Sequence, residues 1–200
     1  EAIKLYQEAL EIQKKVLGVE HPDVAWSLYS LGDAYDSKGN YDEAIKLYQE
    51  ALEIQKKVLG GGDPDVAKTL YNLGAACYKK GNYDEAIKLY EQALEIQKKV
   101  LGVEHPDVAT SLNNLGVAYD RKGNYDEAIK LYEQALEIDK KVWGVEHPAV
   151  VTSLNNLGLA YDSKGNHDKA IKLFEQALEI DKKVLGVEHP DVAISLNNLG

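Results

Sequence analysis

The sequence repeats itself with a period of 42 residues. Prolines follow this interval at Pro22, Pro64, Pro106, Pro148 and Pro190. Residues 85–126 and 127–168 differ at only seven of 42 aligned positions, which indicates recent tandem duplication. A period of this size is typical of solenoids and propellers, in which each repeat packs mainly against its neighbours. The chain is therefore predicted to be a tandem array rather than a single core built from unlike elements.

Two α-helices are predicted within each repeat. The apolar positions of the first segment are spaced by three and four residues, as on one face of a helix: Val24, Leu28, Leu31 and Tyr35. This spacing predicts a first helix, helix A, over 22–38, and a second apolar stripe predicts helix B over 42–59. Gly39 lies between them, where a glycine commonly ends a helix in a left-handed conformation. Apolar and polar residues do not alternate as in a strand, so each repeat is predicted to be a helical hairpin.

The predicted array spans residues 1–200 as a single domain. It consists of helix B of an incomplete repeat over 1–18, complete repeats over approximately 19–60, 61–102, 103–144 and 145–186, and a partial helix A over 187–200. Each complete repeat holds one helix A and one helix B. Stacking such repeats is expected to bury a continuous thin core.

The histidine of the recurring phrase LGVEHPDVA raises the question of metal or acid–base chemistry, but its position favours helix capping. His21 precedes Pro22, and proline is favoured at the first position of a helix. In the second copy Asp63 replaces the histidine, and aspartate is among the best N-cap residues. A metal ligand would not tolerate this replacement, and copies 42 residues apart would lie in different repeats. We therefore expect these residues to cap helix A, and we expect no metal site.

The composition narrows the classes of function. A net charge of −10 argues against a nucleic acid partner, because that binding relies on lysine and arginine to neutralise phosphates. No apolar run is long enough to span a bilayer, so we expect no membrane partner. Cys77 is the single cysteine, which fits a reducing compartment, and the cytoplasm is the expected location. Phosphate-binding, dinucleotide-binding and metalloprotease motifs do not occur, so we expect neither an enzyme nor a bound cofactor.

The positions of helix A and helix B together resemble the tetratricopeptide repeat. The matching run is Leu28-x-x-Leu31-Gly32-x-x-Tyr35, followed by Gly39, Tyr41, Ala44, Tyr48 and Ala51. The 42-residue unit is longer than the ordinary repeat, and with HPDVA opening helix A and LNNLG within it the unit is similar to the repeats of kinesin light chains. The resemblance implies an all-α, right-handed superhelical solenoid of antiparallel helix pairs that serves protein–protein interaction.

The same resemblance implies that the A helices line a concave groove and that the B helices form the outer face. The residues of helix A outside its apolar stripe are then the candidates for peptide binding: Trp26, Tyr29, Lys68, Tyr71, Asn72, Lys79, Asn113, Asn114, Arg121, Asn155, Asn156, Asn197 and Asn198. We expect a polar or mixed-charge partner peptide with an apolar anchor near Trp26 and Tyr71.

Adjacent asparagines occur on three successive A helices, at 113–114, 155–156 and 197–198. A side-chain amide offers donors and an acceptor, which suits holding the main chain of an extended peptide. In tetratricopeptide repeats that bind peptides, asparagines at such places contact the main chain of the ligand. Alternatively, the amides bond to each other between adjacent A helices and stabilise the stack. Both interpretations are open at this point.

A scaffold that binds a partner protein or peptide is thus the predicted function, and self-assembly is the alternative. The sequence begins within a helix B and stops within a helix A, without the polar caps that arrays commonly carry. The apolar stripes at the two ends differ from each other, so a contact between them would be heterologous and would propagate. This alternative predicts head-to-tail stacking or helix exchange.

Overall fold

The computed structural model describes residues 2–199, and within that range it contains helices and turns but no strand. The helices are α1 (Ala2–Leu17), α2 (Pro22–Asp36), α3 (Tyr41–Val58), α4 (Pro64–Lys79), α5 (Tyr83–Leu101), α6 (Pro106–Arg121), α7 (Tyr125–Trp143), α8 (Pro148–Ser163), α9 (His167–Leu185) and α10 (Pro190–Asn197). Even-numbered helices correspond to helix A and odd-numbered helices to helix B. The predicted all-α fold of paired helices is confirmed.

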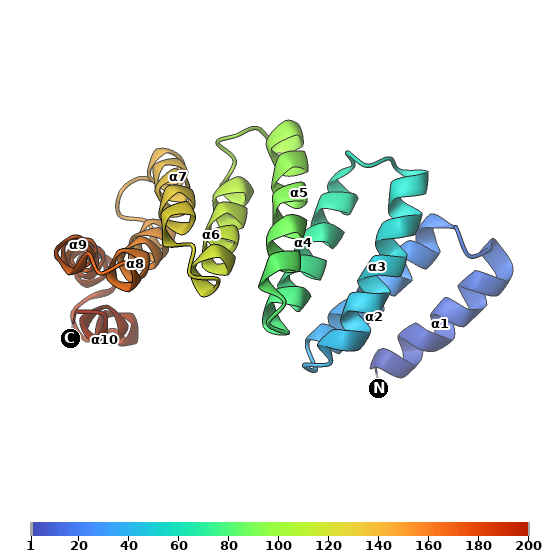
Figure 1. The fold of residues 1–200 in the computed structure, drawn as a ribbon. Coiled ribbons are helices and arrows are strands. Elements are labelled where there is room, and N and C mark those ends of the chain that lie inside the picture. The colour runs from blue at the N-terminus through green and yellow to red at the C-terminus, as the bar shows by residue number, and fades with distance from the viewer. Residues whose placement is uncertain (1, 200) are drawn as a thin grey trace. The chain divides into compact units, whose positions relative to one another are not determined.

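The chain forms two compact units, Glu1–Val100 and Leu101–Gly200. In the first unit α1 packs on α2, α2 on α3, and α3 on α4, in blue to green in Figure 1. In the second unit each helix from α6 to α10 packs on the next, in yellow to red. Helix α2 also contacts α4, and α6 contacts α8. Within each unit, therefore, successive A helices are neighbours, and side chains 42 or 43 positions apart in sequence can meet.

The residue before each A helix caps it, as the sequence predicts. His21 has an extended backbone, with φ −77° and ψ 143°, and its Nδ1 accepts a hydrogen bond from the Asp23 backbone N–H at 3.1 Å. Asp63 makes the same bond with a carboxylate oxygen, which accepts from the Asp65 N–H at 2.8 Å. Both side chains satisfy a backbone donor that has no partner within the helix. The capping function of the histidines is confirmed.

Close approach of helix A to helix B requires glycine in the middle of helix A. A Cβ atom placed on Gly32 would lie 2.8 Å from Cε1 of Tyr48 in α3. In the second unit a Cβ on Gly158 would lie 2.5 Å from Cε1 of Phe174 in α9. Such distances are shorter than van der Waals contact, so an aromatic ring of helix B occupies the space that a side chain would need.

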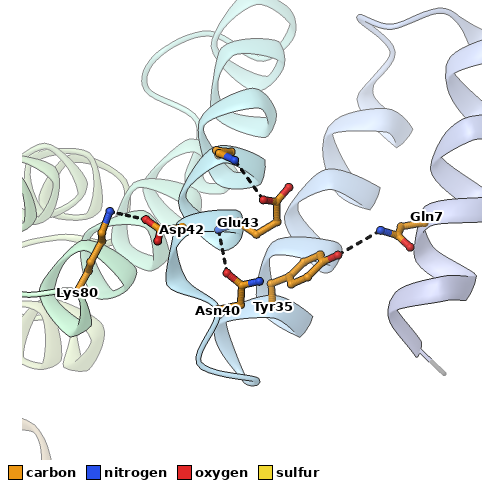
Figure 2. Close-up of polar contacts among 7 residues, drawn as sticks. Gln7, Tyr35, Asn40, Asp42, Glu43 and Lys80 are labelled. Carbon is orange, nitrogen blue, oxygen red and sulfur yellow. Dashed lines mark hydrogen bonds and ion pairs between the residues drawn. The ribbon is translucent and has the colours of Figure 1, made fainter.

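The first turn ends helix A two residues earlier than the sequence predicts. Helix α2 stops at Asp36, because Gly39 has φ 76° and the Asn40 N–H bonds back to the Tyr35 carbonyl at 3.0 Å. Asn40 then caps α3, its Oδ1 accepting from the Glu43 N–H at 3.4 Å (Figure 2). Left-handed glycine followed by a capping residue sets the sharp reversal between the two helices.

Polar side chains join neighbouring helices near this turn. Gln7 of α1 donates to the Tyr35 hydroxyl at 3.2 Å, and Lys80 forms an ion pair with Asp42 (Figure 2). The Lys80 ammonium donates a hydrogen bond to Asp42 and holds the pKa of that carboxyl below its ordinary value. Both contacts lie at the surface, where ion pairs contribute little to stability. Of the helices in the described range, none is long and apolar enough to cross a membrane.

Candidate partner-binding surface

The A helices of the first unit present one exposed aromatic residue, Trp26, near Lys68. Trp26 on α2 is 63% exposed, and Lys68 on α4 is exposed as well. Tyr71 and Asn72 are half-buried on the same helix. Tyr29 differs from the expectation of an open position, because its side chain is only 8% exposed. Its ring packs at 5.7 Å from the ring of Tyr48, between helix A and helix B.

A polar network joins α2, α3 and α4 beneath this surface. The Asn72 amide donates to the Tyr29 hydroxyl at 2.6 Å and to Asp33 Oδ1 at 3.2 Å. The Tyr48 hydroxyl donates to the same Asp33 oxygen at 2.6 Å. Burial, reinforced by the Asp33 carboxylate, raises the pKa of both tyrosines, so both hydroxyls stay protonated as donors. Asn72 and Tyr29 therefore tie neighbouring repeats together.

The two predicted lysines of α4 contact side chains of α2 and α3. Lys68 Nζ lies 4.9 Å from the centre of the Tyr29 ring. Lys79 Nζ forms an ion pair with Asp36 at 2.5 Å and lies 5.7 Å from the Tyr41 ring centre. Attraction between an ammonium and an aromatic face is strongest where water is excluded. These contacts orient both lysines along the A-helix face.

A cavity of about 310 Å³ opens where α2, α3 and α4 meet. Its lining comes from the first turns of both A helices and from the last turns of α3: Pro22, Asp23, Ala25, Trp26, Tyr29, Ile54, Gln55, Val58, Leu59, Asp65, Lys68 and Thr69. The cavity thus combines apolar walls with a few polar groups, as binding pockets commonly do. It brings Trp26, Tyr29 and Lys68 of the predicted set together.

In the second unit the asparagines bond across neighbouring A helices. The Asn156 amide donates to Asn113 Oδ1 at 3.4 Å, between α8 and α6. The Asn198 amide donates to Asn155 Oδ1 at 3.3 Å, between α10 and α8. Asn113 in turn donates to the Ser153 hydroxyl at 2.9 Å. These are the bonds that the stabilising interpretation of the doubled asparagines describes.

Asn114, Arg121 and Asn197 are the other predicted residues of this unit. Asn114 is half-buried, and its amide donates to the Thr110 carbonyl one turn earlier in α6 at 3.0 Å. Arg121 is exposed at the last position of α6, and Asn197 is exposed at the last position of α10. The structure therefore brings together Asn113 with Asn156 and Asn155 with Asn198.

Buried polar pairs between helix B and the following helix A are the feature that sequence reasoning missed. Asp139, only 4% exposed, accepts a hydrogen bond from the Ser153 hydroxyl at 2.7 Å. Burial raises the pKa of Asp139, and the bond from Ser153 partly offsets that rise. A signal was present, since a serine or threonine lies 14 positions after a glutamine or aspartate in each copy. That spacing crosses a turn and belongs to neither helical period.

Cys77 is buried in α4 and only 3% exposed. Burial raises the pKa of its thiol to about 11, so the thiol stays protonated at neutral pH and is a poor nucleophile. Across the described residues, no group of three or more histidines, cysteines, aspartates or glutamates is placed to hold a metal ion.

Comparisons with known proteins agree with this architecture. A family model described as tetratricopeptide repeat matches residues 1–57, 65–141, 122–183 and 149–200. No curated protein matches the chain.

Solved structures are similar over nearly the whole chain. One of them holds TPR-like repeats, nearly identical to one another, of a Podosopora anserina protein assigned as a kinesin light chain. Its sequence is 34% identical to this chain, and the TM-score is 0.85 over 92% of this chain and 87% of that one. BtubC (BKLC) from P. vanneervenii is 27% identical, with a TM-score of 0.79 over 98% of this chain and 80% of that one. MamA is 26% identical, with a TM-score of 0.68 over 91% and 88%.

Proposed function

Because the chain belongs to the tetratricopeptide-repeat family, whose repeats generally serve protein–protein interaction, we propose that it is a scaffold that binds an extended segment of a partner protein along its A helices. The observation that carries this proposal is the exposed Trp26 beside the cavity between α2, α3 and α4. An exposed tryptophan ring presents a large apolar area to water, and a partner can cover that area. Tryptophan is also among the residues that dominate binding energies at protein interfaces.

The other exposed tryptophan differs in its surroundings. Trp143 ends α7, a B helix, and its ring stacks on His147 at 4.9 Å with the two planes 15° apart. Part of its apolar area is thereby already covered by the next repeat. Trp26 is therefore the stronger candidate for an anchor, and Trp143 is its natural control.

The asparagine ladder, formed by the bonds from Asn156 to Asn113 and from Asn198 to Asn155, supports binding as well as stacking. An amide nitrogen carries two N–H groups, and the bond from Asn156 to Asn113 uses one of them. Bonds between neighbouring amides also fix the direction in which each amide points. A ladder of oriented amides is suited to hold the main chain of an extended segment, so stabilisation and recognition are compatible.

We propose that the chain acts without catalysis and in the cytoplasm. Kinesin light chain-like repeats are typically non-enzymatic scaffolds. The protonated, buried thiol of Cys77 supports a structural part for the single cysteine.

A peptide-display selection tests the proposed function. The unchanged protein, Trp26→Ala and Trp143→Ala are each used to select binders from the same library. We expect a common motif to be enriched by the unchanged protein and by Trp143→Ala, and to be lost with Trp26→Ala. Enrichment that survives Trp26→Ala and disappears with Trp143→Ala would place the interaction on the B-helix side and contradict the proposal.

Self-association is the second candidate function, favoured by exposed apolar side chains on α1. Leu5, Ile12 and Val16 are 61%, 64% and 72% exposed. Apolar patches of this kind mark interaction sites. Sedimentation velocity over a wide concentration range tests self-association. We expect the assemblies to grow with protein concentration and to be reduced by Ile12→Lys, and a constant monomer mass would rule self-association out.

A further inference from the structure

A buried hydroxyl bonds to the preceding helix B in several repeats. The Ser27 hydroxyl donates to Gln13 Oε1 at 2.6 Å, between α2 and α1. In the second unit the Ser195 hydroxyl donates to Asp181 at 2.6 Å, between α10 and α9, as Ser153 does to Asp139. In each case the two residues are 14 positions apart; the two serine–aspartate bonds are buried, and the Ser27–Gln13 bond is partly buried.

The pair that lines the cavity departs from this pattern, and so does Gln97, whose Oε1 is also buried without a partner among the described residues. Thr69 and Gln55 stand at the equivalent places, 1% and 9% exposed. Within residues 2–199, Thr69 Oγ1 and Gln55 Oε1 are nevertheless both buried without a hydrogen-bond partner. A buried polar atom without a partner is costly, and such atoms are uncommon in folded proteins. Both residues line the cavity beside Trp26.

The chemistry of these two groups defines a complementary guest. Gln55 Oε1 can only accept a hydrogen bond, whereas the Thr69 hydroxyl can donate one. A primary carboxamide offers the matching pair, an N–H donor and a carbonyl acceptor. Ile54, Val58 and the Trp26 ring provide apolar walls for the methylene groups that carry it.

The charges around the cavity favour a neutral guest. Lys68 and the carboxylates of Asp23 and Asp65 all line it, so a charged group of either sign would meet a like charge. A charged guest would also lose its hydration on contact with the buried, neutral side chains of Gln55 and Thr69. A carboxamide avoids both costs.

We propose that this cavity is a specificity pocket for a glutamine or asparagine side chain of the partner segment, an inference that rests on the proposed function. The guest N–H donates to Gln55 Oε1, and the Thr69 hydroxyl donates to the guest carbonyl. Both oxygens are covered in the free protein, so binding requires both the Gln55 and the Thr69 side chain to turn toward the cavity. The Trp26 ring covers the aliphatic stem of the guest.

Peptides selected by display provide the probe. Calorimetric titration compares a selected peptide with versions in which its glutamine or asparagine is replaced by leucine or by glutamate. We expect both replacements to weaken binding at least about tenfold, because each leaves buried groups of the pocket unpaired. Selected peptides that depend on Trp26 but show no preferred glutamine or asparagine would overturn the pocket while leaving the proposed function in place. A selection that yields no Trp26-dependent peptide would reject both.

Two conservative variants test the pocket from the protein side. Thr69→Ser keeps the hydroxyl donor and should retain the affinity for the glutamine peptide. Thr69→Val removes the donor and should weaken binding of that peptide about tenfold. Ser153→Thr makes a matched exchange in the second unit and should leave the affinity unchanged. Equal affinity of all four proteins for the glutamine peptide would refute the inference.

Discussion

At the residue scale, buried polar side chains make the copies differ from one another. The position 14 residues before the buried hydroxyl is glutamine in the first three copies, at residues 13, 55 and 97, and aspartate at Asp139 and Asp181. Gln13 and both aspartates accept the hydroxyl bond, whereas Gln55 Oε1 and Gln97 Oε1 have no partner among the described residues. A glutamine carbonyl accepts this bond at no charge cost, whereas an ionised aspartate must be desolvated. The pKa of Asp139 is accordingly raised by burial, in spite of the Ser153 bond and the attraction of His147.

Asp139→Gln should therefore raise stability at neutral pH, by about 1 kcal/mol, because a buried charge is replaced by a neutral acceptor of the same bond. A carboxyl group whose pKa is higher in the folded state than in the unfolded state binds protons preferentially when folded. The unchanged protein should then gain stability from this group as the pH falls toward the ordinary value of 3.8. Urea unfolding of both proteins at several pH values checks this, and an advantage of the variant that does not shrink on acidification would contradict it.

At the scale of helix pairs, each hairpin depends on a cap and on one close contact. The cap fixes where helix A begins, and the glycine lets an aromatic ring of helix B lie against its backbone. The tightness of that contact varies between copies: a Cβ on Gly158 would lie 2.5 Å from the Phe174 ring, and one on Gly74 would lie 3.0 Å from the Tyr90 ring. Equivalent substitutions should therefore have unequal costs.

Gly158→Ala is expected to destabilise the fold by about 1–2 kcal/mol, because overpacking costs more than the gain in helix propensity. Gly74→Ala is its matched control and should be nearly neutral, since a small shift of the Tyr90 ring makes room. Thermal unfolding followed by circular dichroism measures both variants. Equal costs for the two would show that ring contact is not the cause.

Asp63→Ala should cost about 1 kcal/mol, because the Asp65 N–H at the start of α4 loses its acceptor. Asp63→His introduces the residue that caps α2 and should retain most of the stability. Chemical unfolding of the two variants provides the comparison. A histidine variant as unstable as the alanine variant would contradict equivalence of the two caps.

At the scale of the whole molecule, stability is expected to be a sum of terms from neighbouring helices. Each described glycine contact pairs one helix A with the helix B that follows it, and the buried hydroxyl bonds pair one helix B with the next helix A. Such an array has no central core that every mutation would disturb.

Effects in separate repeats should therefore add. The Cβ added by Gly32→Ala meets the Tyr48 ring, whereas the Cβ added by Gly158→Ala meets the Phe174 ring. The two substitutions therefore share no contacting residue. The double variant should lose the sum of the two single losses within about 0.5 kcal/mol. Urea unfolding of the single and double variants measures this, and a much larger coupling would indicate cooperation beyond neighbouring helices.

The sequence by itself determined the repeat, the helix pairs and the caps. These features depend on spacing within one repeat, and apolar period, proline and glycine report such spacing directly. Helix α2 ends two residues earlier than the sequence predicts, because hydrogen bonds of the turn, rather than the apolar stripe, end the helix.

Only the tertiary structure decided which polar atoms meet. Tyr29 and Asn72 are 43 positions apart, and their bond exists because α2 lies against α4 at that height. Gln55 and Thr69 stand at the same places as Gln13 and Ser27, yet only the second pair forms its bond. A hydrogen bond is lost when its donor and acceptor shift apart by fractions of an ångström, whereas the apolar pattern tolerates such shifts. The apolar pattern therefore predicts the helices, and the packing of the helices decides which polar groups bond to each other.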